Sequence, residues 1–130
     1  MRATKQSGQF LTGVGLFNAR KFFQAHEVWE ELWLQEPQPE KSFLQGLIQL
    51  AAACHHHSRG NARGARSLAT AGLAKLARFP DDHRGLALAE LRSQADRWLE
   101  TLGGEGDPGV QTLPRIRLVA RSGTAKKPGS

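Results

Sequence analysis

The decapeptide QAHEVWEELW at residues 24–33 holds one histidine, three glutamates and two tryptophans, with no proline or glycine. A carboxylate beside a histidine can fix the tautomer of the imidazole and tune its proton affinity for acid–base catalysis. His26 and Glu30 lie four residues apart, so a helix would place them on one face. They are therefore the candidate catalytic pair and also candidate metal ligands.

A second stretch, SFLQGLIQLAAACHHHSRG at residues 42–60, is apolar except for a few side chains on one side. Gln45, Gln49 and His56 fall within about 40° of one another on a helical wheel, together with Ala52. A buried amide or imidazole without a hydrogen-bond partner costs about 1–3 kcal/mol. We therefore expect these three side chains to meet His26 and Glu30 across a helix contact, with Glu27 as a further binding residue.

Three interpretations of this cluster remain open. The favoured one is a hydrogen-bonded polar layer that fixes the register of two helices and has no enzymatic role. The second is a divalent metal held by His26, Glu30 and His56, since helical bundles build metal sites from facing carboxylates and imidazoles. The third is an acid–base site of the hydrolase type, and the sequence assigns no reaction to it.

The sequence excludes some more specific kinds of site. A zincin needs the H-E-x-x-H pattern, and here Glu30 stands in place of the second histidine. The run His55, His56 and His57 cannot converge on one ion, because consecutive helical residues fan out over about 200°. Cys54 projects away from the two glutamines and His56, which predicts core packing for its thiol.

The elements that position these residues are separated by breakers at Pro37 and Pro39, at Gly60-Asn61 and at Phe79-Pro80. Helices are predicted over residues 9–17, 22–34, 42–60, 61–78 and 83–102. In the second helix Phe22, Trp29 and Trp33 form the core face, with His26 and Glu30 looking inward. The third helix should be central and buried. Small residues on the fourth should permit close approach of a neighbour.

Composition predicts one all-α domain of about five helices over residues 9–102, since 130 residues suit a single core. No apolar run is long enough to span a bilayer, the N-terminus carries no secretory signal pattern, and a single cysteine favours the cytoplasm. Residues 103–130 are rich in glycine and proline and read as a flexible basic tail. The net charge of +6 divides evenly between residues 1–102 and residues 103–130. A binding module for a peptide or for nucleic acid that uses the tail, and a homo-oligomer, also stay open. The candidate cations for a nucleic-acid contact are Arg115, Arg117, Arg121, Lys126 and Lys127.

The segments LFNARKFFQAHEVWEELW, FLQGLIQLAAACHHHSRGNARGA and AKLARFP followed by HRGLALAEL closely resemble the domain of unknown function family 309. The resemblance runs from about residue 16 to residue 91. It implies a compact all-helical domain without an established activity. Its pattern includes Phe23, His26, Glu27 and Glu30, the run from residue 43 to 49, and a histidine that corresponds best to His56. An aspartate often follows Gly-Leu in the family, whereas this chain has Ala87.

Overall fold

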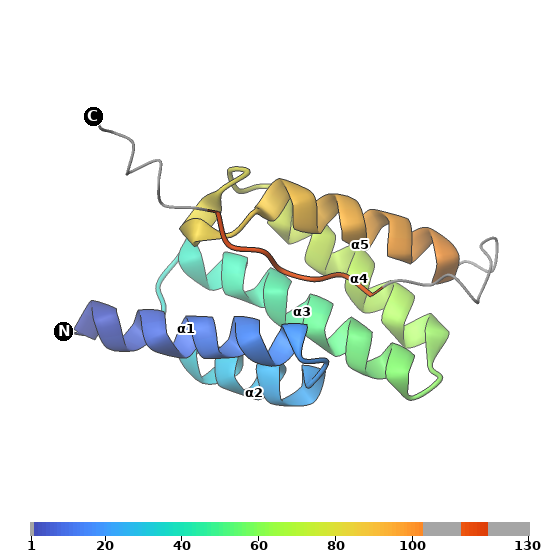
Figure 1. Ribbon diagram of the computed structural model, residues 1–130, viewed down its shortest axis with the longest axis horizontal. Helices are drawn as coiled ribbons and strands as arrows, with labels where there is room; N and C mark the ends of the chain where they lie inside the picture. Colours follow the sequence, from blue (N-terminus) through green and yellow to red (C-terminus); the bar gives the residue numbers. More distant parts are fainter. Residues whose placement is uncertain (1, 103–112, 120–130) are drawn as a thin grey trace.

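The computed structural model describes residues 2–102 and 113–119 and confirms the all-α prediction (Figure 1). The helices are α1 (Arg2–Asn18), α2 (Phe22–Trp33), α3 (Glu40–Ser58), α4 (Ala62–Leu76) and α5 (Leu88–Leu102), with a short 3-10 helix, η1 (His83–Gly85), before α5. The extended pairing in the described ranges is an isolated bridge between Leu86 and Leu118. None of the described helices is both long and apolar enough to cross a membrane.

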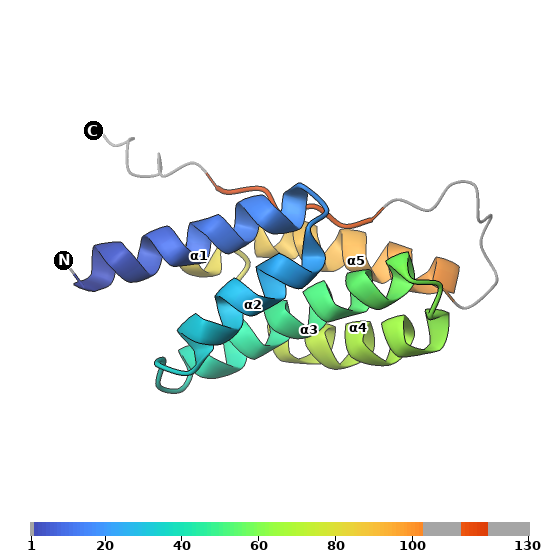
Figure 2. The same ribbon diagram turned by 90° about the horizontal axis from the view of Figure 1, so that it is seen from below.

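Helices that follow one another in the chain also pack together, and α3 lies between α2 and α4 (Figure 2). α3 is the most buried helix, as predicted, because its apolar residues cover nearly every side. Two glycines let α3 and α4 touch along their backbones: a Cβ on Gly72 would lie 2.8 Å from the carbonyl oxygen of Gly46. The predicted close approach by small residues of the fourth helix is therefore confirmed.

α1 begins at Arg2, well before the predicted start at Gln9. Gly13 lies within α1, where its missing side chain makes room for the indole of Trp29 from α2. Trp29 is completely buried, and its Nε1 donates a hydrogen bond of 3.1 Å to the carbonyl oxygen of Phe10. This contact fixes the rotation of α2 and therefore decides which of its side chains face outward.

α5 begins at Leu88, five positions after the predicted start at His83. The residues between form η1, in which Arg84 has a left-handed φ of 56°. The carbonyl oxygen of Asp81 accepts hydrogen bonds from the amides of Leu88 (2.7 Å) and Ala89 (3.2 Å). A backbone carbonyl thus satisfies the first amides of α5, which helix periodicity does not reveal.

Residues 113–119 run between α1 and α5 (Figure 1, red). Ile116 is buried, and its backbone is held by Asn18 of α1, whose side chain donates to the Ile116 carbonyl and accepts from the Ile116 amide, both at 2.8 Å. The Arg115 amide donates to Gln94 of α5 at 2.8 Å. The prediction of a flexible tail from residue 103 therefore does not extend to this segment; the rest of that tail lies outside the described residues.

Candidate functional site

α2 presents the candidate residues at one edge and on its outer face. Its core face is formed by Phe22, Ala25, Trp29 and Leu32. His26 is half-buried at the edge of that face, whereas Glu27 and Glu30 are exposed. The prediction that Glu30 looks inward is wrong, because Ala25 and Leu32 shift the centre of the core face, and Glu30 lies about 140° from Ala25 around the helix.

α3 contributes a half-buried row on its solvent side, formed by Gln45, Gln49, Ala52 and His56. α4 borders this row closely. A Cβ on Gly72 would lie 3.3 Å from the Cβ of Gln49, and a Cβ on Gly64 would lie 3.2 Å from Nδ1 of His56. The predicted grouping of these polar side chains on one side of α3 is therefore present, and the row lies at the surface instead of deep inside a helix contact.

Hydrogen bonds do not join the five predicted cluster residues to one another. His56 instead pairs with Asn61, whose Nδ2 lies 2.9 Å from Nδ1 of His56 while its Oδ1 accepts from the Gly64 amide. His56 Nδ1 therefore accepts, which places the proton of the neutral ring on Nε2. The hydrogen-bonded polar layer is not formed as predicted.

Two polar atoms in this region have no partner among the described residues. Nδ1 of His26 and Oε1 of Gln49 are both buried and form no hydrogen bond. Leaving such an atom unsatisfied costs about 1–3 kcal/mol. Buried unsatisfied groups are few in native proteins and call for an explanation, so this pair is the most informative feature of the surface.

An exposed aromatic ring lies beside His26. Phe23 is 50% exposed, stacks on His26 with the ring centroids 6.1 Å apart at an interplanar angle of 14°, and packs against His55 at 5.4 Å. We refer to this surface as the α2–α3 face, and it comprises Phe23, His26, Glu27, Glu30, Gln45, Gln49 and His56. Its surface presents an exposed aromatic ring and two exposed carboxylates, and the unsatisfied atoms of His26 and Gln49 are buried beneath them.

The face is poorly suited to metal or thiol chemistry. Across the described residues, no three His, Cys, Asp or Glu side chains are arranged to hold a metal ion, so His26, Glu30 and His56 do not form the ligand set considered from the sequence. The only cysteine is completely buried, as predicted. Burial raises the pKa of the Cys54 thiol to about 12, so it carries no thiolate near neutral pH.

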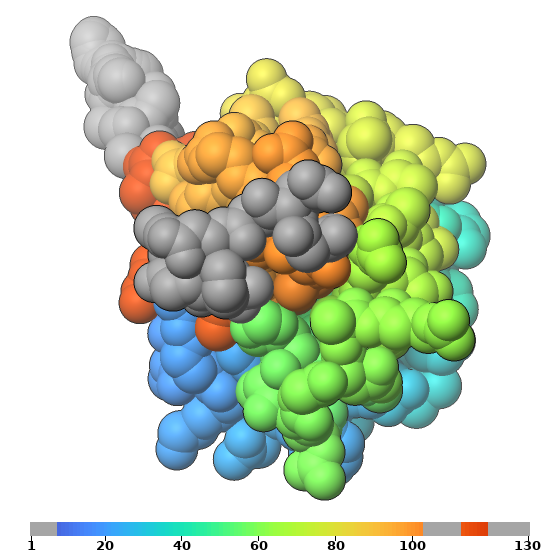
Figure 3. All heavy atoms as spheres, turned by 90° about the vertical axis from the view of Figure 1, so that its right-hand side faces the viewer, coloured from blue at the N-terminus to red at the C-terminus, as the bar shows by residue number. Residues whose placement is uncertain are grey.

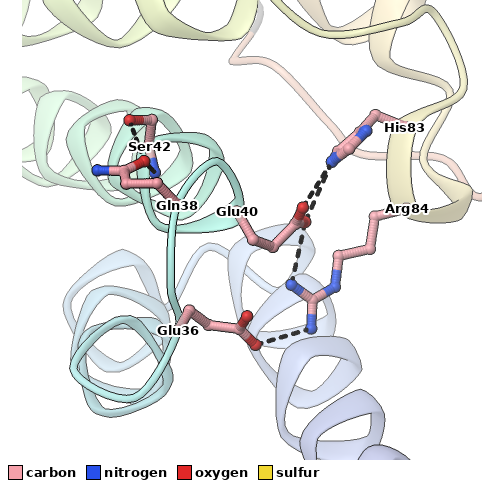
Figure 4. A network of polar contacts seen from close by, with 6 residues as sticks. All are labelled: Glu36, Gln38, Glu40, Ser42, His83 and Arg84. Carbon is pink, nitrogen blue, oxygen red and sulfur yellow. Dashed lines mark hydrogen bonds and ion pairs between the residues drawn. The ribbon is translucent and has the colours of Figure 1, made fainter.

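The strongest ionic cluster lies elsewhere, between the α2–α3 loop and η1 (Figure 4). Glu40 accepts from His83 Nε2 at 3.0 and 3.1 Å and from Arg84 Nη1 at 3.2 Å, and Glu36 lies 3.7 Å from Arg84 Nη2. The Arg84 guanidinium also covers the Phe10 ring at 4.5 Å. These contacts hold Arg84 in its left-handed backbone conformation and clamp η1 to α1 and α3.

This clamp was missed from the sequence, and only a weak signal pointed to it. Glu40 and His83 are separated by 43 positions, so helix periodicity cannot pair them. His83 is wedged against Phe43 and Phe79, with centroid distances of 4.5 and 4.9 Å. The signal was the placement of opposite charges next to two proline-containing breaks. The charged groups of this clamp are partly buried and paired with one another, which suits a structural role.

The described tail cations are only partly available. Arg117 binds Glu90 through Nε (2.9 Å) and Nη2 (2.8 Å), and this hydrogen bond raises the pKa of Arg117. Arg115 is exposed. The other candidate cations, Arg121, Lys126 and Lys127, lie outside the described residues. Ala87, which replaces the aspartate often seen in the resembled family, is buried and donates its amide to the Arg117 carbonyl at 2.7 Å.

Comparison with known proteins bears on the α2–α3 face directly. Residues 10–68 match the family model described as Domain of unknown function (DUF309). The resemblance to DUF309 is confirmed. The DUF309 match covers all of α2 and α3, with parts of α1 and α4, and so contains every residue of the α2–α3 face. It ends before α5 and η1.

Two relatives have names that state no activity. An uncharacterized protein of Aquifex aeolicus is 34% identical over 86 residues, which cover 65% of this chain and 26% of that protein. The uncharacterized protein YpuF of Bacillus subtilis is 44% identical over 50 residues, which cover 38% of this chain and 29% of YpuF. The matched segments thus span less than a third of either relative.

Proposed function

We propose that this protein is a non-catalytic recognition domain whose α2–α3 face binds a basic, partly apolar segment of another polypeptide. The observation that carries the proposal is the pair of buried, unpartnered atoms, Nδ1 of His26 and Oε1 of Gln49. Oε1 of Gln49 is buried, so the half-buried side chain would turn to the surface to accept from N–H donors of a bound segment. That hydrogen bond would recover the free energy that the free protein forgoes. Ligand-binding sites are usually pre-formed and contain a few polar groups that bond to the ligand. The α2–α3 face would share this property.

Charge supports a basic partner. Residues 22–40 contain five glutamates and no lysine or arginine, and Glu27 and Glu30 are exposed on the outer face of α2. Carboxylates near the edge of an interface attract cationic partners and orient their approach. Phe23 supplies the apolar contact, since partly exposed aromatic rings often anchor interfaces.

Catalysis has less support from the same geometry. Acid–base work by His26 would need a carboxylate or carbonyl that fixes its tautomer, and none bonds to its Nδ1 within the described residues. The interpretation of the cluster as a divalent metal site lacks a set of three ligands there. A cytoplasmic location fits this proposal, because the single thiol is buried and reduced.

The direct test is fluorescence anisotropy of a labelled helical peptide in which lysine and leucine residues form opposite faces. We expect the full chain to bind this peptide and to bind a version with glutamate for lysine at least tenfold more weakly. Phe23→Ala and Gln49→Ala should each weaken binding of the lysine peptide. Gln24→Ala, at an exposed position on another side of α2, is the matched control. Equal affinity for both peptides, or variants that bind like the control, would contradict the proposal.

A further inference from the structure

Charge is strongly segregated along the chain. Residues 41–80 contain six lysines and arginines and no aspartate or glutamate, whereas residues 22–40 have the opposite composition. The first of these stretches builds α3 and α4, and the second builds α2. The acidic and basic surfaces therefore lie on different helices, separated by the uncharged row of α3.

The cations gather along and around α4. The buried stripe of α4 is formed by Ala65, Ala69, Gly72 and Leu76. Arg63 lies about 150° from the centre of this stripe, whereas Arg66 and Lys75 lie on the two flanks of the helix, each about 90° from that centre. We define the α4 basic face as Arg59, Arg63, Arg66, Lys75 and Arg78. All are exposed except Lys75, which is half-buried. Figure 3 views the molecule from the end at which α3 turns into α4 (green), and α4 forms one side of the surface there.

These side chains differ in their pairing from three arginines elsewhere in the described chain. Arg84, Arg92 and Arg117 each bind a carboxylate, at 3.2, 2.6 and 2.8 Å. Among the side chains of residues 8–102 and 113–119, no ion pair or side-chain hydrogen bond engages the cations of the α4 basic face. Their charge is thus uncompensated by the protein and available to an anionic partner.

The kind of side chain indicates which anion fits. Four of the five cations are arginines, whose planar guanidinium binds phosphate through two parallel hydrogen bonds. The large exposed apolar residues of the described chain are Leu11, Phe23, Leu34 and Leu118, and none lies on α4. A protein interface needs apolar anchors and a membrane-surface helix needs an apolar face. Phosphate contacts need neither.

We propose that the α4 basic face binds the phosphate backbone of nucleic acid without reading its sequence. α4 has 15 residues and is therefore about 22 Å long, which is between about six and seven base pairs of duplex. The net charge of +6 favours approach to a polyanion, while the acidic α2 turns the molecule so that α4 faces it. This site is separate from the α2–α3 face and does not depend on the function proposed for that face.

The test is anisotropy of fluorescein-labelled 20-base-pair DNA and RNA duplexes with the full chain at 50 to 200 mM salt. Neutralising two phosphate contacts should lower the slope of log affinity against log salt by about 1.8, at roughly 0.9 per contact. We expect that loss for the double variant Arg63→Gln/Arg66→Gln. Arg97→Gln, an exposed arginine on α5, should leave the slope unchanged. Circular dichroism of each variant is the control that checks its folding.

Other outcomes overturn the proposal. A triple variant, Arg121→Gln/Lys126→Gln/Lys127→Gln, that removes the salt dependence while the α4 variant keeps it would transfer the contact to the C-terminal residues. Binding to phosphatidylserine vesicles without binding to either duplex would make the partner a membrane surface. Sedimentation velocity tests for self-association. If the Arg63→Gln/Arg66→Gln variant changes only the oligomeric state, the α4 basic face binds the acidic α2 of a second copy instead of nucleic acid.

Discussion

Gly13→Ala should destabilise the domain, although alanine favours helices by about 1 kcal/mol over glycine. A Cβ at position 13 would lie 2.1 Å from Nε1 of Trp29, whereas ordinary contacts begin at 3.4 Å. The indole must therefore move by about 1.3 Å, the difference between these two distances. Because it is completely buried, the movement breaks its hydrogen bond to Phe10 and strains the core.

The opposing effects can be compared in size. Overpacking a core costs about 1–3 kcal/mol, and the hydrogen bond is worth about 0.5–1.5 kcal/mol. These losses exceed the helix-propensity gain, so the free energy of unfolding should fall by about 1–3 kcal/mol. Gly15→Ala is the matched control in the same helix, because a Cβ there meets nothing within 4 Å. It should stabilise the domain by about 0.5–1 kcal/mol.

Urea unfolding followed by circular dichroism and tryptophan fluorescence measures both changes. The same movement of Trp29 would rotate α2 and disturb the α2–α3 face, so Gly13→Ala should also bind the lysine peptide more weakly than Gly15→Ala does. If the two variants are equally stable, the close packing of Trp29 on Gly13 does not fix α2, and the account of how the face is positioned fails.

Three further predictions concern other parts of the fold. Asn18→Ala should release residues 113–119, seen as faster hydrogen exchange of the Ile116 amide with little change at α3 amides; unchanged exchange would contradict the anchoring role. Glu40→Gln should lower the free energy of unfolding by about 1–2 kcal/mol because it weakens the clamp on His83 and Arg84, whereas the exposed Glu100→Gln should not. Cys54 should react with a thiol reagent only when the protein unfolds, and rapid labelling of the native protein would refute this. The free energy of unfolding should also fall as the pH rises from about 9, the ordinary thiol pKa, toward 12, because in that range the thiol loses its proton only in the unfolded chain.

The helices were predictable because their periodicity reflects local geometry. Phe22 and Trp29 lie on the predicted core face of α2, and the small residues of α4 allow the predicted approach to α3. The start of α5 was not predictable, because it depends on the Asp81 carbonyl and on the clamp around Arg84, whose partners are distant in sequence. Residues 113–119 were missed for a similar reason: their anchor is Asn18, far away in the chain.

The candidate site was predicted in composition but not in arrangement. The sequence grouped Gln45, Gln49 and His56 correctly on one side of a helix. The sequence does not reveal the rotation of α2, which is set by the packing of Trp29 on Gly13. Glu30 was therefore predicted to face inward, although it is exposed. A helical wheel also cannot show that His56 forms its hydrogen bond with Asn61, the residue just before α4.

The most direct test of the recognition role is the free energy of unfolding of Gln49→Met, measured together with peptide binding. If Oε1 of Gln49 is held unsatisfied for a ligand, methionine removes that cost, so stability should rise by about 1 kcal/mol while affinity for the lysine peptide falls. If Gln49→Met is less stable than the parent protein and binds the peptide equally well, Gln49 is a structural residue and the α2–α3 face is not a recognition site.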